Sequence, residues 1–129
     1  MLVDETSMRE VLIVDDSPDL RGMLAFTLGD LGYAIREAKN GEDALIELAD
    51  HAPDCVVLDL MMPGLDGFKV LETMRERDLA PGARVVILSC REDEPSFVRG
   101  YELHADEFFV KPVDPDLVAH KISALIEAG

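Results

Sequence analysis

Asp59 is the residue of this chain whose surroundings most favour chemistry. Val56, Val57 and Leu58 form a short apolar run before it, and Pro63-Gly64 turns the chain soon after it. This pattern is typical of a buried parallel strand whose carboxyl end brings an acid to solvent. A carboxylate in that place could be a covalent nucleophile, or it could simply end the strand because a charge cannot stay in the core.

Three other apolar runs end at polar residues in the same way. Residues 11–14 precede Asp15-Asp16, residues 85–88 precede Ser89, and residues 108–110 precede Lys111-Pro112. If these runs are parallel strands of one sheet, their carboxyl ends share the edge at which such sheets bind ligands. That edge would hold three carboxylates, one hydroxyl and one ammonium. Three close carboxylates repel one another unless a cation neutralises them, and a hard ion such as Mg²⁺ takes oxygen ligands.

The segments between the apolar runs have the periodicity of amphipathic helices. Ser17-Pro18 begins the first helix as an N-cap followed by proline, and Gly32 ends it. Its apolar face is predicted to carry Leu20, Met23, Leu24, Leu28 and Leu31. We predict two further helices that begin at Asn40-Gly41 and Asp66-Gly67, two over residues 95–103 and 114–127, and a weaker strand over residues 33–38.

Five strands that alternate with five helices predict an α/β unit with a doubly wound parallel sheet and helices on both faces. The length of 129 residues corresponds to one domain. We expect this domain to span residues 10–128, after a loose polar and acidic extension over residues 1–9.

Acidic residues outnumber basic residues by 27 to 12, which gives a net charge of −15. Lysine and arginine form no cluster, so we expect no direct contact with nucleic acid or with an anionic membrane, because both require positive charge. The first nine residues lack the pattern of a signal peptide, and no apolar run approaches the roughly 18 residues of a membrane span. Cys55 and Cys90 have neither a disulfide framework nor metal-ligand spacing, so we expect reduced thiols in a cytoplasmic protein.

The order and spacing of these segments resemble the receiver domain of two-component response regulators. The segments that match are Val14-Asp15-Asp16, the run from Asp59 to Gly67, Leu88-Ser89, and the run from Ala105-Asp106 to Lys111-Pro112. The resemblance extends over most of the chain and implies a flavodoxin-like sheet with strand order 2-1-3-4-5. It also implies that Asp59 accepts a phosphoryl group from a sensor histidine kinase or a phosphotransfer protein. Beyond its own phosphorylation and dephosphorylation, such a domain is not expected to be an enzyme.

The resemblance further implies a metal site at this edge. Mg²⁺, for which Mn²⁺ could substitute, would bind Asp16, Asp59 and the backbone carbonyl of Met61. Asp15 would contribute directly or through a water molecule.

Two residues are expected to bind the phosphoryl group. Lys111 would supply positive charge to its oxygens, and Ser89 would donate a hydrogen bond to one of them. The Lys111-Pro112 bond is expected to be cis, as in the family. On phosphorylation, the resemblance implies that Ser89 moves toward the phosphate and that Phe108 turns inward. Because phenylalanine lacks the hydroxyl that tyrosine carries, we predict a switch that works by packing alone.

The surface changed by this switch would be formed by the fourth helix, the fifth strand and the fifth helix. A downstream protein, or an effector domain fused in a longer chain, would be contacted there, and a homodimer could form through the same face. The charged candidates on it are Arg99, Glu102, Glu107, Asp116, His120 and Lys121. Each is expected to be a solvated charge rather than an interface hot spot.

Several positions near the predicted site are unusual or variable in the family. His104 stands where glycine is usual at the end of the fourth helix, and a left-handed backbone there costs histidine more than glycine. Cys90 replaces the small residue that usually follows the hydroxyl, and it could crowd access to Asp59. By resemblance, Met61 and Arg91 occupy variable positions flanking the phosphate, which in the family influence how long it survives.

Two other functions remain open. A pseudo-receiver would keep the fold as a phosphorylation-independent docking module, although all five site positions are present. A Mg²⁺-dependent phosphohydrolase of the haloacid dehalogenase type also uses an aspartate at the end of a strand, but it needs a second acid two residues later, where Met61 stands. His51 and His120 are expected to be surface residues, and no histidine has the context of a phosphorelay donor or a metal ligand.

Overall fold

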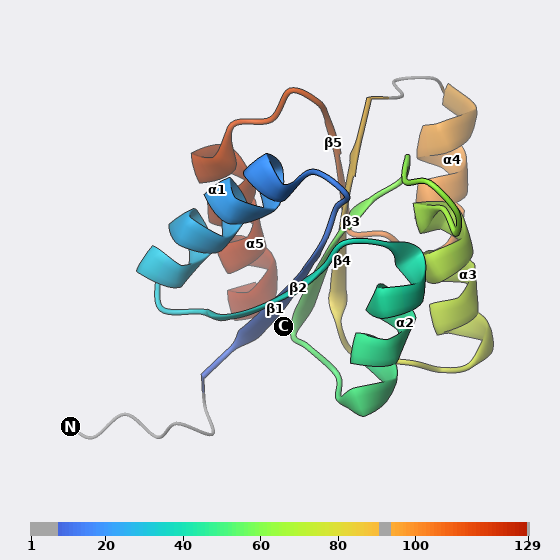
Figure 1. The fold of residues 1–129 in the computed structure, drawn as a ribbon, viewed down its shortest axis with the longest axis horizontal. Helices are drawn as coiled ribbons and strands as arrows, with labels where there is room; N and C mark the ends of the chain where they lie inside the picture. Colours follow the sequence, from blue (N-terminus) through green and yellow to red (C-terminus); the bar gives the residue numbers. More distant parts are fainter. Residues whose placement is uncertain (1–7, 91–93, 129) are drawn as a thin grey trace.

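The computed structural model describes residues 8–90 and 94–128. Most of the predicted extension over residues 1–9 therefore lies outside the described residues, as does Arg91. Within the described ranges, five strands alternate with five helices (Figure 1). The strands are β1 (Glu10–Val14), β2 (Ala34–Ala38), β3 (Cys55–Asp59), β4 (Arg84–Ser89) and β5 (Glu107–Val110). The helices are α1 (Pro18–Asp30), α2 (Gly41–Asp50), α3 (Gly67–Glu76), α4 (Glu94–Glu102) and α5 (Pro115–Ala128).

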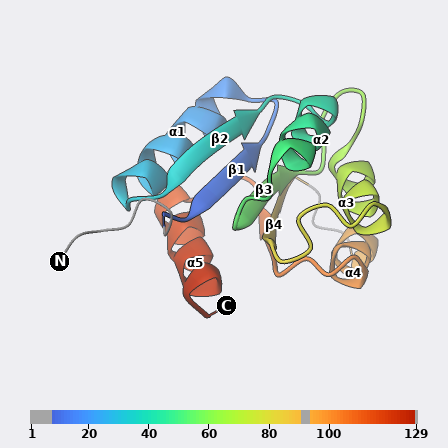
Figure 2. The same cartoon turned by 90° about the horizontal axis from the view of Figure 1, so that it is seen from below.

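The strands form one sheet in the order β2-β1-β3-β4-β5, and each neighbouring pair is parallel. Helices α1 and α5 cover one face of the sheet, and α2, α3 and α4 cover the other (Figures 1 and 2). The predicted doubly wound fold and its strand order are confirmed. Among the described residues, none of the helices is long and apolar enough to cross a membrane. The strand order reverses next to β1 and β3, so the crevice at their carboxyl ends is where such a sheet binds ligands.

The sheet separates two hydrophobic cores. Val56 and Ile87 belong to the core beneath α2, α3 and α4, whereas Val57 and Leu88 belong to the core beneath α1 and α5. Consecutive residues of a strand alternate between the two cores because their side chains point to opposite faces. All four are fully buried, which explains why the central strands read as continuous apolar runs.

The apolar face of α1 is narrower than predicted. Leu24 and Leu28 are fully buried, but Met23 and Leu31 are 50% and 55% exposed, so the prediction was wrong at these two residues. Met23 lies about 100° around the helix from Leu24, and Leu31 is the C-cap beyond the last turn. Phe26 is 78% exposed on the same helix. Only a stripe of α1 therefore contacts the sheet and α5.

Three helices begin directly after the loops that leave the sheet. The side chains of Ser17, Asn40 and Asp66 each accept a hydrogen bond from the backbone N–H three residues further on, at 3.3, 2.7 and 2.9 Å. These N-caps satisfy donors that the first helical turn leaves unpaired. They also fix where α1, α2 and α3 start, close to the carboxyl ends of the strands.

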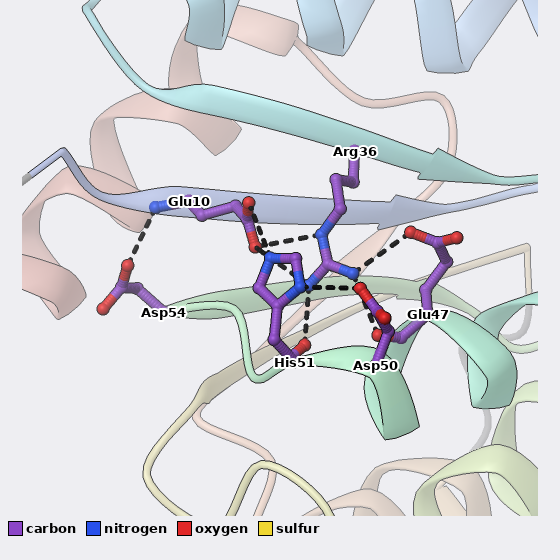
Figure 3. Close-up of polar contacts among 6 residues, drawn as sticks. All are labelled: Glu10, Arg36, Glu47, Asp50, His51 and Asp54. Carbon is purple, nitrogen blue, oxygen red and sulfur yellow. Dashed lines mark hydrogen bonds and ion pairs between the residues drawn. The ribbon is translucent and has the colours of Figure 1, made fainter. Parts of the chain in front are cut away.

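Arg36 on β2 connects the first residue of β1 with the end of α2 (Figure 3). Its guanidinium donates to the Glu10 carboxylate at 2.9 Å and to the backbone carbonyls of Glu47 at 2.9 Å and His51 at 2.8 Å. His51 is exposed, as predicted, and its hydrogen bonds to Asp50 and Glu10 raise its pKa. This network holds the amino-terminal edge of the sheet, away from the polar strand ends.

His104 follows α4 with a backbone φ of 65°, in the left-handed region. Arg75 of α3 donates to the carbonyls of Leu103 at 2.9 Å and of His104 at 3.2 Å. The backbone at this position is thus held in a conformation that glycine adopts at lower cost.

Replacing His104 with glycine should raise the free energy of unfolding by about 0.5–1 kcal/mol. Relief of the left-handed strain outweighs the extra entropy that glycine gives the unfolded chain. Equilibrium urea denaturation measures the change. In a control, His120→Gly at an exposed position within α5 should lower stability by about 1 kcal/mol. A loss of stability in both variants would contradict the strain at residue 104.

Candidate functional site

Three carboxylates meet at the carboxyl ends of the two central strands. Asp15 and Asp16 follow β1, and Asp59 ends β3. One carboxylate oxygen from each lies within 4.8 Å of the others, the only such group of potential metal ligands among the described residues. Asp15 and Asp59 are buried, with 0% and 1% of their surface exposed, whereas Asp16 is exposed. The edge thus combines two buried acids with one that solvent reaches.

Lys111 follows β5, and its ammonium contacts both buried carboxylates. Its Nζ lies 2.9 Å from Asp15 Oδ2 and 3.4 Å from Asp59 Oδ2. The backbone N–H of Lys111 donates to the Ser89 carbonyl at 2.7 Å, and the bond to Pro112 is cis. Ser89 is fully buried as the last residue of β4. The structure therefore places all five predicted polar positions at one edge of the sheet.

The negative charge of the ionised Asp59 carboxylate is only partly neutralised by its surroundings. Burial and the neighbouring Asp15 raise the pKa of Asp59 to about 6, while the Met61 N–H and Lys111 oppose the shift. Burial lowers the pKa of Lys111, but its hydrogen bond to Asp15 and the charges of both aspartates outweigh this effect and raise the pKa. The edge holds three carboxylates, of which the Lys111 ammonium contacts two, and the remaining negative charge favours a divalent cation.

Asp15 is held through its backbone and its side chain. Its N–H donates to the Ala38 carbonyl at 3.2 Å, and its Oδ1 accepts from the Ser17 N–H at 2.9 Å. Its carbonyl accepts from Nη1 of Arg21 at 2.7 Å, while Nε of the same guanidinium donates to Glu37 at 3.2 Å. The sequence prediction missed Arg21, because its only signal is a base in α1 shortly after two acids.

The loop after Asp59 packs closely on the end of β3. The Met61 N–H donates to Asp59 Oδ1 at 3.1 Å. At Gly67, the first residue of α3, a Cβ atom would lie 2.3 Å from the Asp59 carbonyl oxygen and 2.8 Å from Cα of Leu60. The sequence indicated Gly67 only as the start of a helix. Its absent side chain also lets α3 approach the backbone of Asp59.

These residues fit a small divalent cation with oxygen ligands. The carboxylates are hard donors, and the exposure of Asp16 and of Met61, at 54%, leaves room for the water molecules that Mg²⁺ retains. Of the other residues expected beside the phosphate, Cys90 is exposed and Arg91 lies outside the described residues. Cys55, at the other end of β3, is buried, and burial raises the pKa of its thiol.

Phe108 of β5 packs against α4. Its ring meets that of Phe97 edge to face, with 4.5 Å between centroids and an interplanar angle of 80°. Phe108 also packs against the core beneath α2, α3 and α4. These contacts are apolar, which suits a switch by packing, and the switch itself stays a prediction.

Of the six charged residues predicted on the surface of α4, β5 and α5, three form ion pairs with described residues. Arg99 forms an ion pair with Glu72 of α3, and its guanidinium lies 4.5 Å from the ring centroid of Phe68. Lys121 of α5 lies 3.2 Å from the Glu107 carboxylate of β5. A partner that uses these side chains would have to compete with neighbouring residues of the same domain.

Comparison with known proteins extends these observations. The response regulator receiver domain family matches residues 11–123. The transcriptional regulatory protein ResD of Bacillus subtilis is 36% identical over 124 residues, which are 96% of this chain and 50% of that protein. The transcriptional regulatory protein AfsQ1 of Streptomyces coelicolor is 35% identical over 122 residues, 95% of this chain and 53% of that protein. The chain thus spans about half the length of these relatives.

Solved structures of similar fold cover nearly the whole chain. The chemotaxis protein CheY4 of Vibrio cholerae has a TM-score of 0.84 at 27% identity, over 92% of this chain and 98% of that chain. The response regulator TrrA of Thermotoga maritima, solved in complex with Mg²⁺ and BeF, has a TM-score of 0.79 at 33% identity, over 92% of this chain and 99% of that chain. The strand order, the acidic edge and these matches agree, and the chain belongs to the response regulator receiver domain family.

Proposed function

We propose that Asp59 accepts a phosphoryl group as the input step of two-component signalling. The observation that carries this proposal is the contact of Lys111 with the two buried carboxylates, at 2.9 Å to Asp15 and 3.4 Å to Asp59. Asp59 ends β3 at the edge where such sheets bind ligands, next to the exposed Asp16, and a cationic side chain already lies beside it.

We further propose that the edge binds Mg²⁺ through Asp16, Asp59 and the backbone carbonyl of Met61, with Asp15 acting directly or through water. Mn²⁺ could take the same place. When bound, the cation neutralises the carboxylates and polarises the phosphoryl oxygens. The Mg²⁺ and BeF complex of TrrA supports this assignment by similarity.

The residues of this chain would position and neutralise the transferring group. An Asp59 carboxylate oxygen approaches the phosphorus in line, and the new P–O bond forms as the P–N bond to the donor imidazole breaks. Lys111 then neutralises a phosphoryl oxygen, and the Ser89 hydroxyl donates to another. Apart from its own phosphorylation and dephosphorylation, the domain has no proposed enzymatic activity.

The partners follow from this chemistry. A sensor histidine kinase or a phosphotransfer protein would supply the phosphoryl group in the cytoplasm. The signal would leave through α4, β5 and α5 to a downstream protein, to an effector domain or to a second copy of the chain. The relatives, which are transcriptional regulatory proteins about twice as long, favour an effector domain. The proposed receiver comprises residues 10–128.

Intact mass spectrometry after incubation with acetyl phosphate and Mg²⁺ tests the proposal. The wild-type chain should gain one phosphoryl group that hydroxylamine removes, and Asp59→Asn should gain none. Lys111→Met should slow the reaction by at least about tenfold, because it removes charge stabilisation from the phosphoryl oxygens.

Asp54→Asn is the matched control, since Asp54 immediately precedes β3 at its other end. It should be phosphorylated like the wild type. Absence of both Mg²⁺ binding and phosphorylation in the wild type would contradict the proposal and favour a docking module. A phosphohydrolase is not favoured, because the exposed Met61 stands where that chemistry needs a second acid.

A further inference from the structure

No partner among the described residues fixes the direction of the Asp16 side chain. It is exposed, and within residues 8–90 and 94–128 it forms no hydrogen bond or ion pair. Asp15, in contrast, is held by Ser17 and Lys111 through its carboxylate. The direction in which Asp16 leaves the chain therefore depends on the backbone between β1 and α1.

Arg21 fixes that backbone. Its Nη1 donates to the Asp15 carbonyl at 2.7 Å, and this oxygen belongs to the planar peptide unit that joins Asp15 to Asp16. A hydrogen bond to the oxygen sets the orientation of the unit, and hence the position from which the Asp16 side chain starts.

The guanidinium of Arg21 is itself well anchored. Its side chain is only 17% exposed, and its Nε donates to Glu37 of β2 at 3.2 Å. Arg21 thus connects α1, the Asp15 carbonyl and β2 through one rigid planar group. The Glu37 carboxylate also offsets the positive charge that Arg21 brings to the cation site.

We propose that Arg21 is a positioning residue for the divalent cation, acting through the Asp15 carbonyl on Asp16. The inference rests on the proposed metal site. Positioning and a simple charge effect predict opposite changes in Mg²⁺ affinity when Arg21 is removed. A cation beside a cation site weakens binding, so electrostatics alone predicts tighter Mg²⁺ binding when Arg21 is removed. Positioning predicts weaker binding.

Isothermal titration with Mg²⁺ alone, on the folded chain without phosphodonor, tests this. Arg21→Met removes both the planar guanidinium with its N–H donors and the positive charge. It should weaken Mg²⁺ binding by about tenfold, the lower end of the loss in metal affinity seen when a residue that orients a metal ligand is removed. Arg21→Lys keeps the positive charge and an N–H donor but lacks the planar guanidinium, and it should weaken Mg²⁺ binding by about threefold. Affinity equal to or above that of the wild type in Arg21→Met would overturn the proposal.

Arg36→Met is the matched control. Arg36, on β2, also donates to backbone carbonyls, those of Glu47 and His51 (Figure 3). These contacts lie at the amino-terminal edge of the sheet, away from the proposed metal site. Both variants should melt at lower temperature, yet Mg²⁺ affinity of Arg36→Met should stay within about twofold of the wild type. A parallel loss of Mg²⁺ affinity in Arg36→Met would overturn the proposal, because general destabilisation would then explain both.

The experiment also distinguishes failure of the Arg21 proposal from failure of the proposed metal site. If Arg21→Met does not fold, Arg21→Lys decides, and unchanged affinity in that variant overturns the inference. If the wild type itself does not bind Mg²⁺, the proposed metal site is wrong, and the role of Arg21 is excluded with it.

Discussion

Replacing Gly67 with alanine should lower the free energy of unfolding by about 3 kcal/mol, the upper part of the range for overpacking. The added Cβ would lie 2.3 Å from the Asp59 carbonyl oxygen and 2.8 Å from Cα of Leu60. Both are backbone atoms, which cannot rotate aside as the end of a flexible side chain can. Relief requires α3 or the end of β3 to move, so Asp59 should be displaced as well.

Urea denaturation of Gly67→Ala and of Gly22→Ala provides the comparison. A Cβ at Gly22, within α1, would meet nothing within 4 Å, and this substitution should raise stability by about 0.5–1 kcal/mol because alanine favours helix over glycine. If Gly67→Ala unfolded at the same urea concentration as the wild type, the predicted clash would be wrong, and α3 would tolerate a wider spacing from β3 than the structure has.

Asp59→Asn should raise the free energy of unfolding at pH 7 by about 2 kcal/mol in the absence of divalent cations. Burial and the charge of Asp15 raise the pKa of Asp59 to about 6 in the folded chain, from the ordinary value of 3.8. The folded chain holds the proton more tightly, so stability falls as pH rises between these values, and the full cost remains above pH 6. The difference corresponds to about 3 kcal/mol. Water that reaches the exposed Asp16 and Met61 beside Asp59 screens its charge and reduces the figure to about 2 kcal/mol.

Urea denaturation of the wild type and of Asp59→Asn at pH 7 and near pH 3.5 tests the direction of this pH dependence. The advantage of Asp59→Asn should be present at pH 7 and nearly lost at the lower pH, where Asp59 is protonated in the folded chain and mostly protonated in the unfolded chain. Glu76→Gln, an exposed carboxylate at the end of α3, should change stability by less than about 0.5 kcal/mol. A gain at pH 7 that persists unchanged near pH 3.5 would mean that charge burial is not its cause.

The elements and the gathering of the polar residues were predictable from sequence because they depend on short patterns. An apolar run that stops at Asp15, Asp59, Ser89 or Lys111 specifies both a strand and the end at which its polar residue lies. Once the strands are parallel, those ends share one edge without further information. Caps such as Ser17 mark the helix starts in the same local way.

The contacts between elements were not predictable in this way. Periodicity assigns a residue to a face of a helix, but it does not say how much of that face a neighbour covers, and Met23 was therefore misplaced. The pairing of Arg21 with the Asp15 carbonyl and of Arg99 with Glu72 depends on how α1 sits on the sheet and α3 beside α4. The close approach at Gly67 likewise appears only when backbone distances are known.

The division of the interior by the sheet has a consequence for how such a domain diverges. Residues that pack under α1 and α5 belong to one core, and those under α2, α3 and α4 belong to the other. Substitutions with no shared neighbours have nearly additive effects, so the two layers can accumulate changes largely independently. One face can therefore acquire new binding preferences while the packing of the other is retained, with the strand-end acids common to both.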